Sequence, residues 1–209
     1  MSGPEDAELP AEFQARLEAL ARSYLATDDP LLQSGFGGGP GRWRAEREPI
    51  LAAVTEGGSF LDVGCANGFL LASLVGWARE RGVALEPWGV DRSAELIALA
   101  RARLPGEASH FFVADAWSWR PPRRFRYVYS LLDVVPESHL RVYVARLLER
   151  AVEPGGVLVL GSYGSRSRGV APLDVADVLA GFGYSVAGEA SGGAGPVTRF
   201  SWIQTRAAR

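Results

Sequence analysis

The sequence predicts a three-layer α/β/α protein built on a mostly parallel β-sheet, and three observations support this fold class. Short apolar runs without polar alternation recur along the chain, as expected for strands that are covered on both faces. Helical stretches separate these runs, so consecutive strands are joined by right-handed crossovers. With 209 residues, 47% of them hydrophobic and 22% charged, the chain is long enough for one globular domain with an ordinary core.

The expected elements follow from the apolar pattern in chain order. Amphipathic spacing predicts helices over 9–26 and 42–55, separated by the irregular glycine-rich segment 35–41. The central strands are expected at 60–63, 85–90, 110–113, 127–132 and 157–160. Further helices are expected at 69–81, 94–104, 137–151 and 172–181. Two last strands, 184–190 and 197–204, flank a glycine-rich turn and predict an antiparallel edge hairpin, which completes a seven-stranded sheet.

The chain divides into two expected parts. Residues 1–41 form an N-terminal helical cap that is hinged at the glycines, and residues 42–209 form the α/β domain. Glycines on both sides of Phe36 suit a lid that opens for product release.

Composition excludes several classes of protein. The 24 acidic and 22 basic residues give a net charge of -2, which provides no general attraction for nucleic acid or anionic lipid. All the basic residues are arginines, so the lysine-dependent chemistry of P-loop and pyridoxal-phosphate enzymes is excluded. One cysteine and two histidines are too few for a structural zinc site, and we expect no metal. The acidic start of the chain and the lack of a long apolar run predict a cytoplasmic protein without a membrane partner.

The strongest motif follows the first expected strand. Residues 60–70 read Phe-Leu-Asp-Val-Gly-Cys-Ala-Asn-Gly-Phe-Leu. Small residues at 64, 66 and 68 let the backbone turn tightly and approach a ligand, whose polar end meets free N–H groups at the start of the next helix. The dinucleotide fingerprint is not met, because Ala66 and Phe69 stand where its second and third glycines belong. We therefore expect a different nucleotide-like ligand, and a ligand-free turn is the alternative.

This segment resembles the first motif of the class I S-adenosylmethionine-dependent methyltransferases, which residues 61–68 match apart from Ala66. The resemblance spans about residues 42–205 and implies a Rossmann-like methyltransferase fold over 42–209. It also implies S-adenosyl-L-methionine as the cofactor and S-adenosyl-L-homocysteine as its product. Within this loop it assigns cofactor contacts to Asp62, Gly64, Cys65, Ala66, Asn67 and Gly68.

Two further segments extend the resemblance at the ends of the second and third strands. Asp91, followed by Arg92, stands where a carboxylate accepts hydrogen bonds from both ribose hydroxyls, and the alternative is that it only helps to start the next helix. By resemblance, Asp115 accepts from the adenine amino group and the Ala116 backbone N–H donates to the ring. Trp117 would then shield the adenine, or would belong to the edge of the core.

The chemistry expected of this family is an in-line displacement, which needs an oriented acceptor in a dry pocket and no metal. The acceptor should lie over the carboxyl ends of the strands, beneath the cap. Asp133, after the fourth strand, is the first candidate for a base or an orienting group, and His139 is the second; a loop carboxylate and a surface histidine are the alternatives. Phe36, Trp43 and Tyr163 are expected to line the acceptor pocket.

We therefore expect a methyltransferase that acts on an oxygen or nitrogen of a small molecule. An RNA or protein methyltransferase is the first alternative, but the one basic run, 120–126, is expected to be a solvated turn, and nucleic acid is not an expected partner. A methyltransferase-like binding protein without turnover is the second alternative, because of Ala66 and the lack of a compelling base. The sequence leaves the acceptor and the oligomeric state open.

Overall fold

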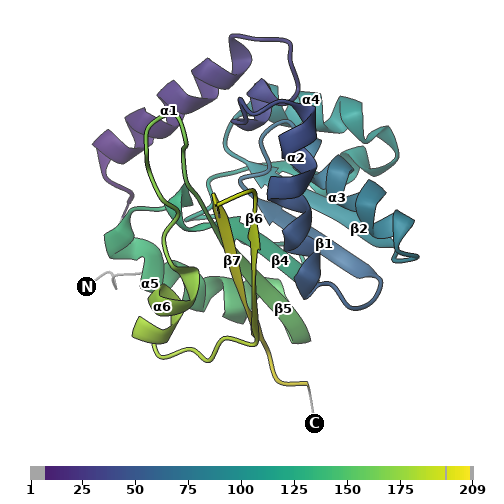
Figure 1. The fold of residues 1–209 in the computed structure, drawn as a ribbon, viewed down its shortest axis with the longest axis vertical. Coiled ribbons are helices and arrows are strands. Elements are labelled where there is room, and N and C mark those ends of the chain that lie inside the picture. Colours follow the sequence, from purple (N-terminus) through teal and green to yellow (C-terminus); the bar gives the residue numbers. More distant parts are fainter. Residues whose placement is uncertain (1–7, 196, 208–209) are drawn as a thin grey trace.

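Seven strands form a single sheet in the order β3-β2-β1-β4-β5-β7-β6 (Figure 1). The structure is a computed structural model that describes residues 8–195 and 197–207. The first five strands are parallel, whereas β7 runs antiparallel to both β5 and β6. The predicted fold class, with its antiparallel edge hairpin, is therefore confirmed. The strands are β1 (Gly58–Val63), β2 (Leu85–Asp91), β3 (Phe111–Val113), β4 (Phe125–Leu131), β5 (Val152–Tyr163), β6 (Gly188–Gly192) and β7 (Thr198–Gln204).

The helices occupy most of the predicted positions. They are α1 (Ala11–Leu25), α2 (Pro40–Arg47), α3 (Phe69–Glu80), α4 (Ala94–Arg103), α5 (Glu137–Arg146) and α6 (Val175–Gly181). The single helix expected over 42–55 is wrong in its bounds. It starts earlier, because Pro40 is well suited to the first turn, and it gives way at Glu48 to a 3-10 segment, Glu48–Ala53, which contains Pro49. Strand β6 begins later than expected, at Gly188.

Two apolar cores lie on opposite faces of the sheet. Leu61 and Val63 of β1 join the core that is covered by α5 and α6, whereas Phe60 joins the core that is covered by α3, α4 and the Glu48–Ala53 segment. Successive residues of one strand are thus buried on both sides, which explains the continuous apolar runs in the sequence. The three layers leave the carboxyl ends of the parallel strands open to the N-terminal segment.

Helix α1 lies outside both helical layers, at one end of the sheet (Figure 1). None of its residues is fully buried. Hydrogen bonds from two loops help to hold this segment in place: the Asn67 side-chain amide donates to the Pro30 carbonyl oxygen at 3.0 Å, and the Arg92 guanidinium donates to the Gln14 carbonyl oxygen at 3.3 Å. Both anchors come from the loops that follow β1 and β2. The N-terminal segment is therefore attached directly to the loop that carries the strongest sequence motif. We propose that residues 1–41 form a cap.

Candidate active site

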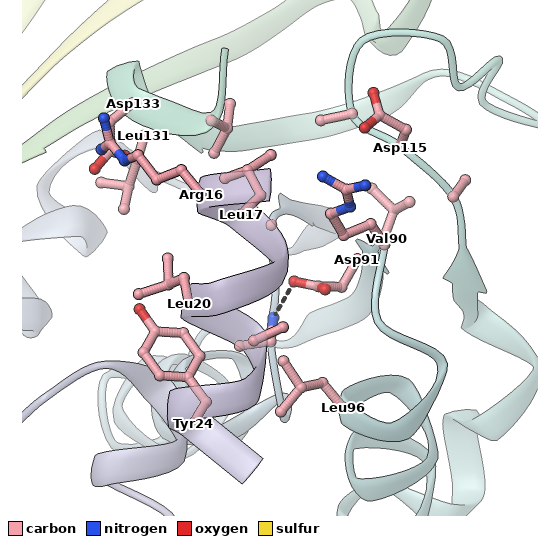
Figure 2. Close-up of a pocket in the computed structure, with 17 residues that line it drawn as sticks. Arg16, Leu17, Leu20, Tyr24, Val90, Asp91, Leu96, Asp115, Leu131 and Asp133 are labelled. Atoms are coloured by element: carbon pink, nitrogen blue, oxygen red, sulfur yellow. Dashed lines mark hydrogen bonds between the residues drawn. The ribbon is translucent and has the colours of Figure 1, made fainter. Parts of the chain in front are cut away.

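A cavity opens between α1 and the carboxyl ends of β1, β2 and β4 (Figure 2). It holds about 860 Å³ of empty space, its open mouth included. It adjoins the point between β1 and β4 where the strand order reverses, the usual ligand position in open α/β sheets. Its walls are Arg16, Leu17, Leu20, Ala21, Tyr24, Gly64, Ala66, Val90, Asp91, Arg92, Leu96, Ala114, Asp115, Ala116, Leu131, Asp133 and Val134.

Part of the predicted site lines this cavity and part does not. The predicted residues on its wall are Gly64, Ala66, Asp91, Arg92, Asp115, Ala116 and Asp133. The predicted residues off the wall are Asp62, Cys65, Asn67, Gly68, Trp117, His139, Phe36, Trp43 and Tyr163. The difference follows the fold: most wall residues lie at the ends of parallel strands and in the loops after them, where the sheet presents its open edge.

The loop after β1 turns through left-handed backbone at Gly64 (φ 90°), Ala66 (φ 46°) and Gly68 (φ 70°). Gly68 has a packing reason, since a Cβ there would come within 2.9 Å of the Ala100 Cβ on α4. Ala66 is the one non-glycine residue with positive φ among the residues that the structure describes. Its conformation explains why the family motif has glycine here, and alanine pays about 1–2 kcal/mol for it.

Asp91 both shapes this loop and faces the cavity. Its carboxylate accepts from the Ser93 backbone N–H and from the Ala66 backbone N–H, both at 2.9 Å. The dashed line in Figure 2 marks the second of these bonds. Ser93 is the N-cap of α4, since its hydroxyl accepts from the Leu96 N–H at 3.2 Å. Burial raises the pKa of Asp91 despite these hydrogen bonds. The two roles considered for Asp91 are therefore compatible in this geometry, because a carboxylate has lone pairs beyond those that the backbone uses.

Three residues of the motif lie behind the cavity wall and support it. Asp62 is 2% exposed, and burial together with the Asp91 charge raises its pKa to about 8. Cys65 is buried, and burial raises the pKa of its thiol well above the usual value, which argues against a nucleophile. The Asn67 side-chain amide is hydrogen-bonded to the Pro30 carbonyl oxygen of the N-terminal segment.

The loop after β3 presents Asp115 and Ala116 to the cavity but turns Trp117 away. The Asp115 carboxylate accepts from the Trp117 N–H at 2.8 Å, which fixes the turn. The Trp117 side chain is buried in the core beneath α5, with the Arg146 guanidinium 3.9 Å above its ring. The packing thus favours the core role for Trp117.

Asp133 lies on the wall next to Arg16 of α1 (Figure 2). It is exposed to the cavity, yet the surrounding walls displace much of the bulk water, so burial raises its pKa while the Arg16 charge opposes the rise. His139 lies outside the cavity, where its ring contacts the edge of Trp117 and its Nδ1 lies 3.0 Å from the Ser138 hydroxyl. Of the two predicted bases, only Asp133 therefore reaches the cavity.

The aromatic residues expected around the acceptor form a separate cluster. Phe36 and Trp43 meet edge to face at 5.2 Å, and the Arg47 guanidinium lies over the Tyr163 ring. The Tyr163 hydroxyl is 2.6 Å from the Tyr129 hydroxyl. These side chains fill the space between α2 and β5 because α1 occupies the position above the cavity.

Sequence reasoning placed the N-terminal cap over the acceptor but did not identify Arg16, Leu17 and Leu20 of α1 as cavity residues. The apolar spacing of α1 predicts a helix with one apolar side, and that side includes Leu17, Leu20 and Tyr24, but nothing local shows what it covers. Arg16 carries no distinguishing signal in the sequence. Among the residues that the structure describes, no group of three or more His, Cys, Asp and Glu side chains is placed to hold a metal ion. No helix in the same part of the chain is long and apolar enough to cross a membrane.

Part of the chain is similar in sequence to known methyltransferases. Residues 60–156 match the family model described as a methyltransferase domain. The chain is similar to trans-aconitate 2-methyltransferase of Rhodopseudomonas palustris (strain BisB18), with 37% identity over 102 residues. This alignment covers 47% of the chain and 36% of that protein, so the similarity extends over little more than a third of the relative.

Solved structures extend the similarity to nearly the whole fold. The N-methyltransferase NodS from Bradyrhizobium japonicum WM9, in complex with S-adenosyl-L-homocysteine, has a TM-score of 0.68 at 16% identity, over 90% of this chain and 97% of that chain. The 1,6-didemethyltoxoflavin-N1-methyltransferase from Burkholderia thailandensis has a TM-score of 0.65 at 18% identity, over 96% and 93%. The chain therefore has the class I methyltransferase fold. Its resemblance to the S-adenosylmethionine-dependent enzymes of that class is confirmed by the domain match over residues 60–156.

Proposed function

We propose that the protein is an S-adenosylmethionine-dependent methyltransferase that methylates an oxygen or nitrogen of a small molecule. One observation carries the proposal: a single cavity wall combines Gly64, Asp91 and Asp115, which follow or end three different parallel strands. These are the strand ends to which the family resemblance assigns the methionine, ribose and adenine parts of the cofactor. The match to a methyltransferase domain supports the same conclusion.

The residues present fit this cofactor. Gly64 is exposed, and its left-handed backbone places no side chain between the loop and the cavity. Asp91 would receive the ribose hydroxyls on its unused lone pairs, and Asp115 would accept from the adenine amino group. Asp62 lies behind Gly64 with a pKa of about 8, so a positive charge held nearby would favour loss of its proton. The cofactor supplies an electrophilic methyl group on a sulfonium.

The cavity also suits a small acceptor. Helix α1 covers part of it with Leu17, Leu20 and Tyr24, which reduces the access of water to the space beside Asp133. Asp133 would orient the acceptor or remove its proton, and its raised pKa makes its carboxylate a stronger base. The relatives are named for small acceptors, trans-aconitate and 1,6-didemethyltoxoflavin, which supports the same size class.

The basic run gives little support to an RNA methyltransferase. Arg123 pairs with Glu153 at 3.2 Å, and Arg126 pairs with Glu56 at 2.7 Å. Guanidinium groups that are already held by carboxylates are poor phosphate-binding groups unless those pairs break. We therefore favour the small-molecule acceptor.

Calorimetric titration with S-adenosylmethionine and S-adenosylhomocysteine, with NAD as the control, tests the cofactor assignment. We expect micromolar binding of both sulfur compounds and no binding of NAD. No heat with either sulfur compound from folded protein would refute the proposal. Release of S-adenosylhomocysteine in the presence of candidate acceptors then tests turnover. Cofactor binding without turnover on any acceptor would favour the binding protein without catalytic activity.

A further inference from the structure

A guanidinium group is buried beside the candidate site. Arg47, the last residue of α2, is 4% exposed. Its guanidinium carbon lies 3.7 Å from the centroid of the Tyr163 ring, 4.9 Å from that of Phe36 and 5.2 Å from that of Trp43. The three rings attract the cation through their faces, but they also remove it from water. The cation is therefore in an environment that strengthens its interaction with any oxyanion that reaches it.

This cation has unused hydrogen-bond donors. To the residues that the structure describes, the guanidinium makes one hydrogen bond, from Nη1 to the Glu46 carbonyl oxygen at 3.3 Å. The Glu46 carboxylate is 3.9 Å from Nη1 and is held instead by Arg42, at 2.8 and 2.9 Å. Within the described part of the chain, Nε and Nη2 have no partner. These two nitrogens form the edge of arginine that binds a carboxylate through two parallel hydrogen bonds.

The position of Arg47 associates it with the Asp133 side of the cavity. Tyr24 lines the cavity; burial and the Asp133 charge raise its pKa to about 12, and the Arg47 charge opposes the rise. A Cβ at Gly35 would collide with the Tyr24 hydroxyl, so this residue of the cavity wall lies against the neighbour of Phe36, whose ring covers Arg47. Arg47 is therefore separated from the region proposed for the acceptor by Phe36 and Tyr24.

We propose that Arg47 binds an acidic group of the methyl acceptor, so that the substrate is a small organic acid with a carboxylate or a phosphonate. The inference rests on the proposed methyltransferase function and names the substrate class of that site. Phe36, at 5% exposure, covers the guanidinium from the glycine-rich segment, where Gly35 (φ 76°) and Gly39 (φ 73°) flank it. The acid reaches Arg47 when this segment rearranges, which its glycines permit at low steric cost.

Matched acids and amides test the proposal in the wild-type protein. Protein saturated with S-adenosylhomocysteine is titrated calorimetrically with benzoate, glutarate, trans-aconitate and phenylphosphonate. The carboxylates are paired with their uncharged amides, and the phosphonate is paired with its dimethyl ester. We expect at least one acid to bind tenfold or more tightly than its uncharged counterpart. Equal binding within every pair, or no binding of any acid, overturns the proposal. S-adenosylhomocysteine is titrated first, so a failure of the proposed methyltransferase function is recognised separately.

Two variants then assign the effect to one guanidinium. Arg47→Met keeps the length and apolar contacts of the side chain, and it should reduce the preference for the acid to twofold or less while the Kd of S-adenosylhomocysteine changes by less than twofold. Arg44→Met is the matched control, because Arg44 lies on the same helix but pairs with Glu48 and Glu80 at the surface. It should keep the full preference. Circular dichroism and the unfolding midpoint show whether each variant is folded.

The same variants exclude the main competing ligand. The methionine part of the cofactor also carries a carboxylate. If Arg47→Met weakens S-adenosylhomocysteine tenfold and leaves 5′-methylthioadenosine, which lacks the amino-acid group, unaffected, the guanidinium serves the cofactor and the proposal is wrong. A retained preference for the acid in folded Arg47→Met overturns it as well.

Discussion

Replacement of Asp91 by Asn removes one negative charge from the cavity wall and preserves the size of the side chain. The carboxylate accepts backbone hydrogen bonds from Ser93 and Ala66, both at 2.9 Å, and it keeps lone pairs directed to ligand hydroxyls. The amide retains one oxygen acceptor and replaces the other oxygen with a donor. Because Oδ1 accepts from the Ser93 N–H and Oδ2 accepts from the Ala66 N–H, the new NH2 group must face one of these donors. The substitution therefore removes one backbone hydrogen bond of the loop together with one acceptor for the ligand.

The substitution should weaken binding strongly, whereas two opposing effects act on stability. Hydrogen bonds to a charged group contribute about 1.5–3 kcal/mol each, and neutral ones about 0.5–1.5 kcal/mol. Replacing two charged bonds by one neutral bond costs about 3 kcal/mol, or roughly 100-fold in the Kd of S-adenosylhomocysteine. Burial raises the pKa of Asp91 in the folded state, so the folded protein binds more protons than the unfolded chain and its ionised carboxylate opposes folding above the unfolded pKa. At pH 8 the loss of this charge stabilises the folded state and the loss of one backbone hydrogen bond destabilises it, so the free energy of unfolding should change by less than about 2 kcal/mol in Asp91→Asn.

Calorimetry and urea unfolding at pH 8 measure these two effects. Asp177→Asn is the control, because it makes the same charge change at an exposed position in the first turn of α6. It should leave the Kd of S-adenosylhomocysteine unchanged. A Kd for Asp91→Asn within threefold of the wild-type value would refute the assignment of Asp91 to the ribose. A weaker Kd accompanied by a large loss of stability would show that Asp91 acts mainly on the structure of the loop.

Three further predictions concern residues around the cavity. Because the pKa of Asp62 is raised from 3.8 to about 8, stability should fall as the pH rises between these values, and urea unfolding at pH 5, 6.5 and 8 should show a flatter profile for Asp62→Asn. Gly64→Ala, at φ 90°, should lower the free energy of unfolding by about 1–2 kcal/mol and weaken S-adenosylhomocysteine. Gly76 lies in open space on α3 and provides the control, because Gly76→Ala should instead raise the free energy of unfolding by about 0.5–1 kcal/mol. Thermal unfolding compares the two variants, and equal effects would contradict the backbone argument. Gly35→Ala, at φ 76°, would place its Cβ against the Tyr24 hydroxyl, so it should destabilise by about 1–2 kcal/mol; an unchanged melting temperature would contradict this contact.

The fold and one wall of the cavity are encoded locally in the sequence. Continuous apolar runs predict strands that are buried on both faces, and the two cores on opposite sides of β1 explain those runs. Gly64, Asp91 and Asp115 could be found because they lie at or just after the carboxyl ends of parallel strands, and a parallel sheet brings such ends together at one edge. A strand end can be recognised from neighbouring residues alone.

The direction of the remaining side chains is a property of the tertiary structure. Trp117 stands beside two cavity residues in the sequence, yet its side chain packs in the core under α5. Phe36, Trp43 and Tyr163 meet around Arg47 instead of lining the cavity, because α1 takes the place above Asp133. The sequence by itself therefore determined the sheet and the cofactor-facing loops. Only the packing of segments far apart in the chain decided what covers the cavity and which cation was left with free donors, because contact between such segments depends on how the whole core fills its space.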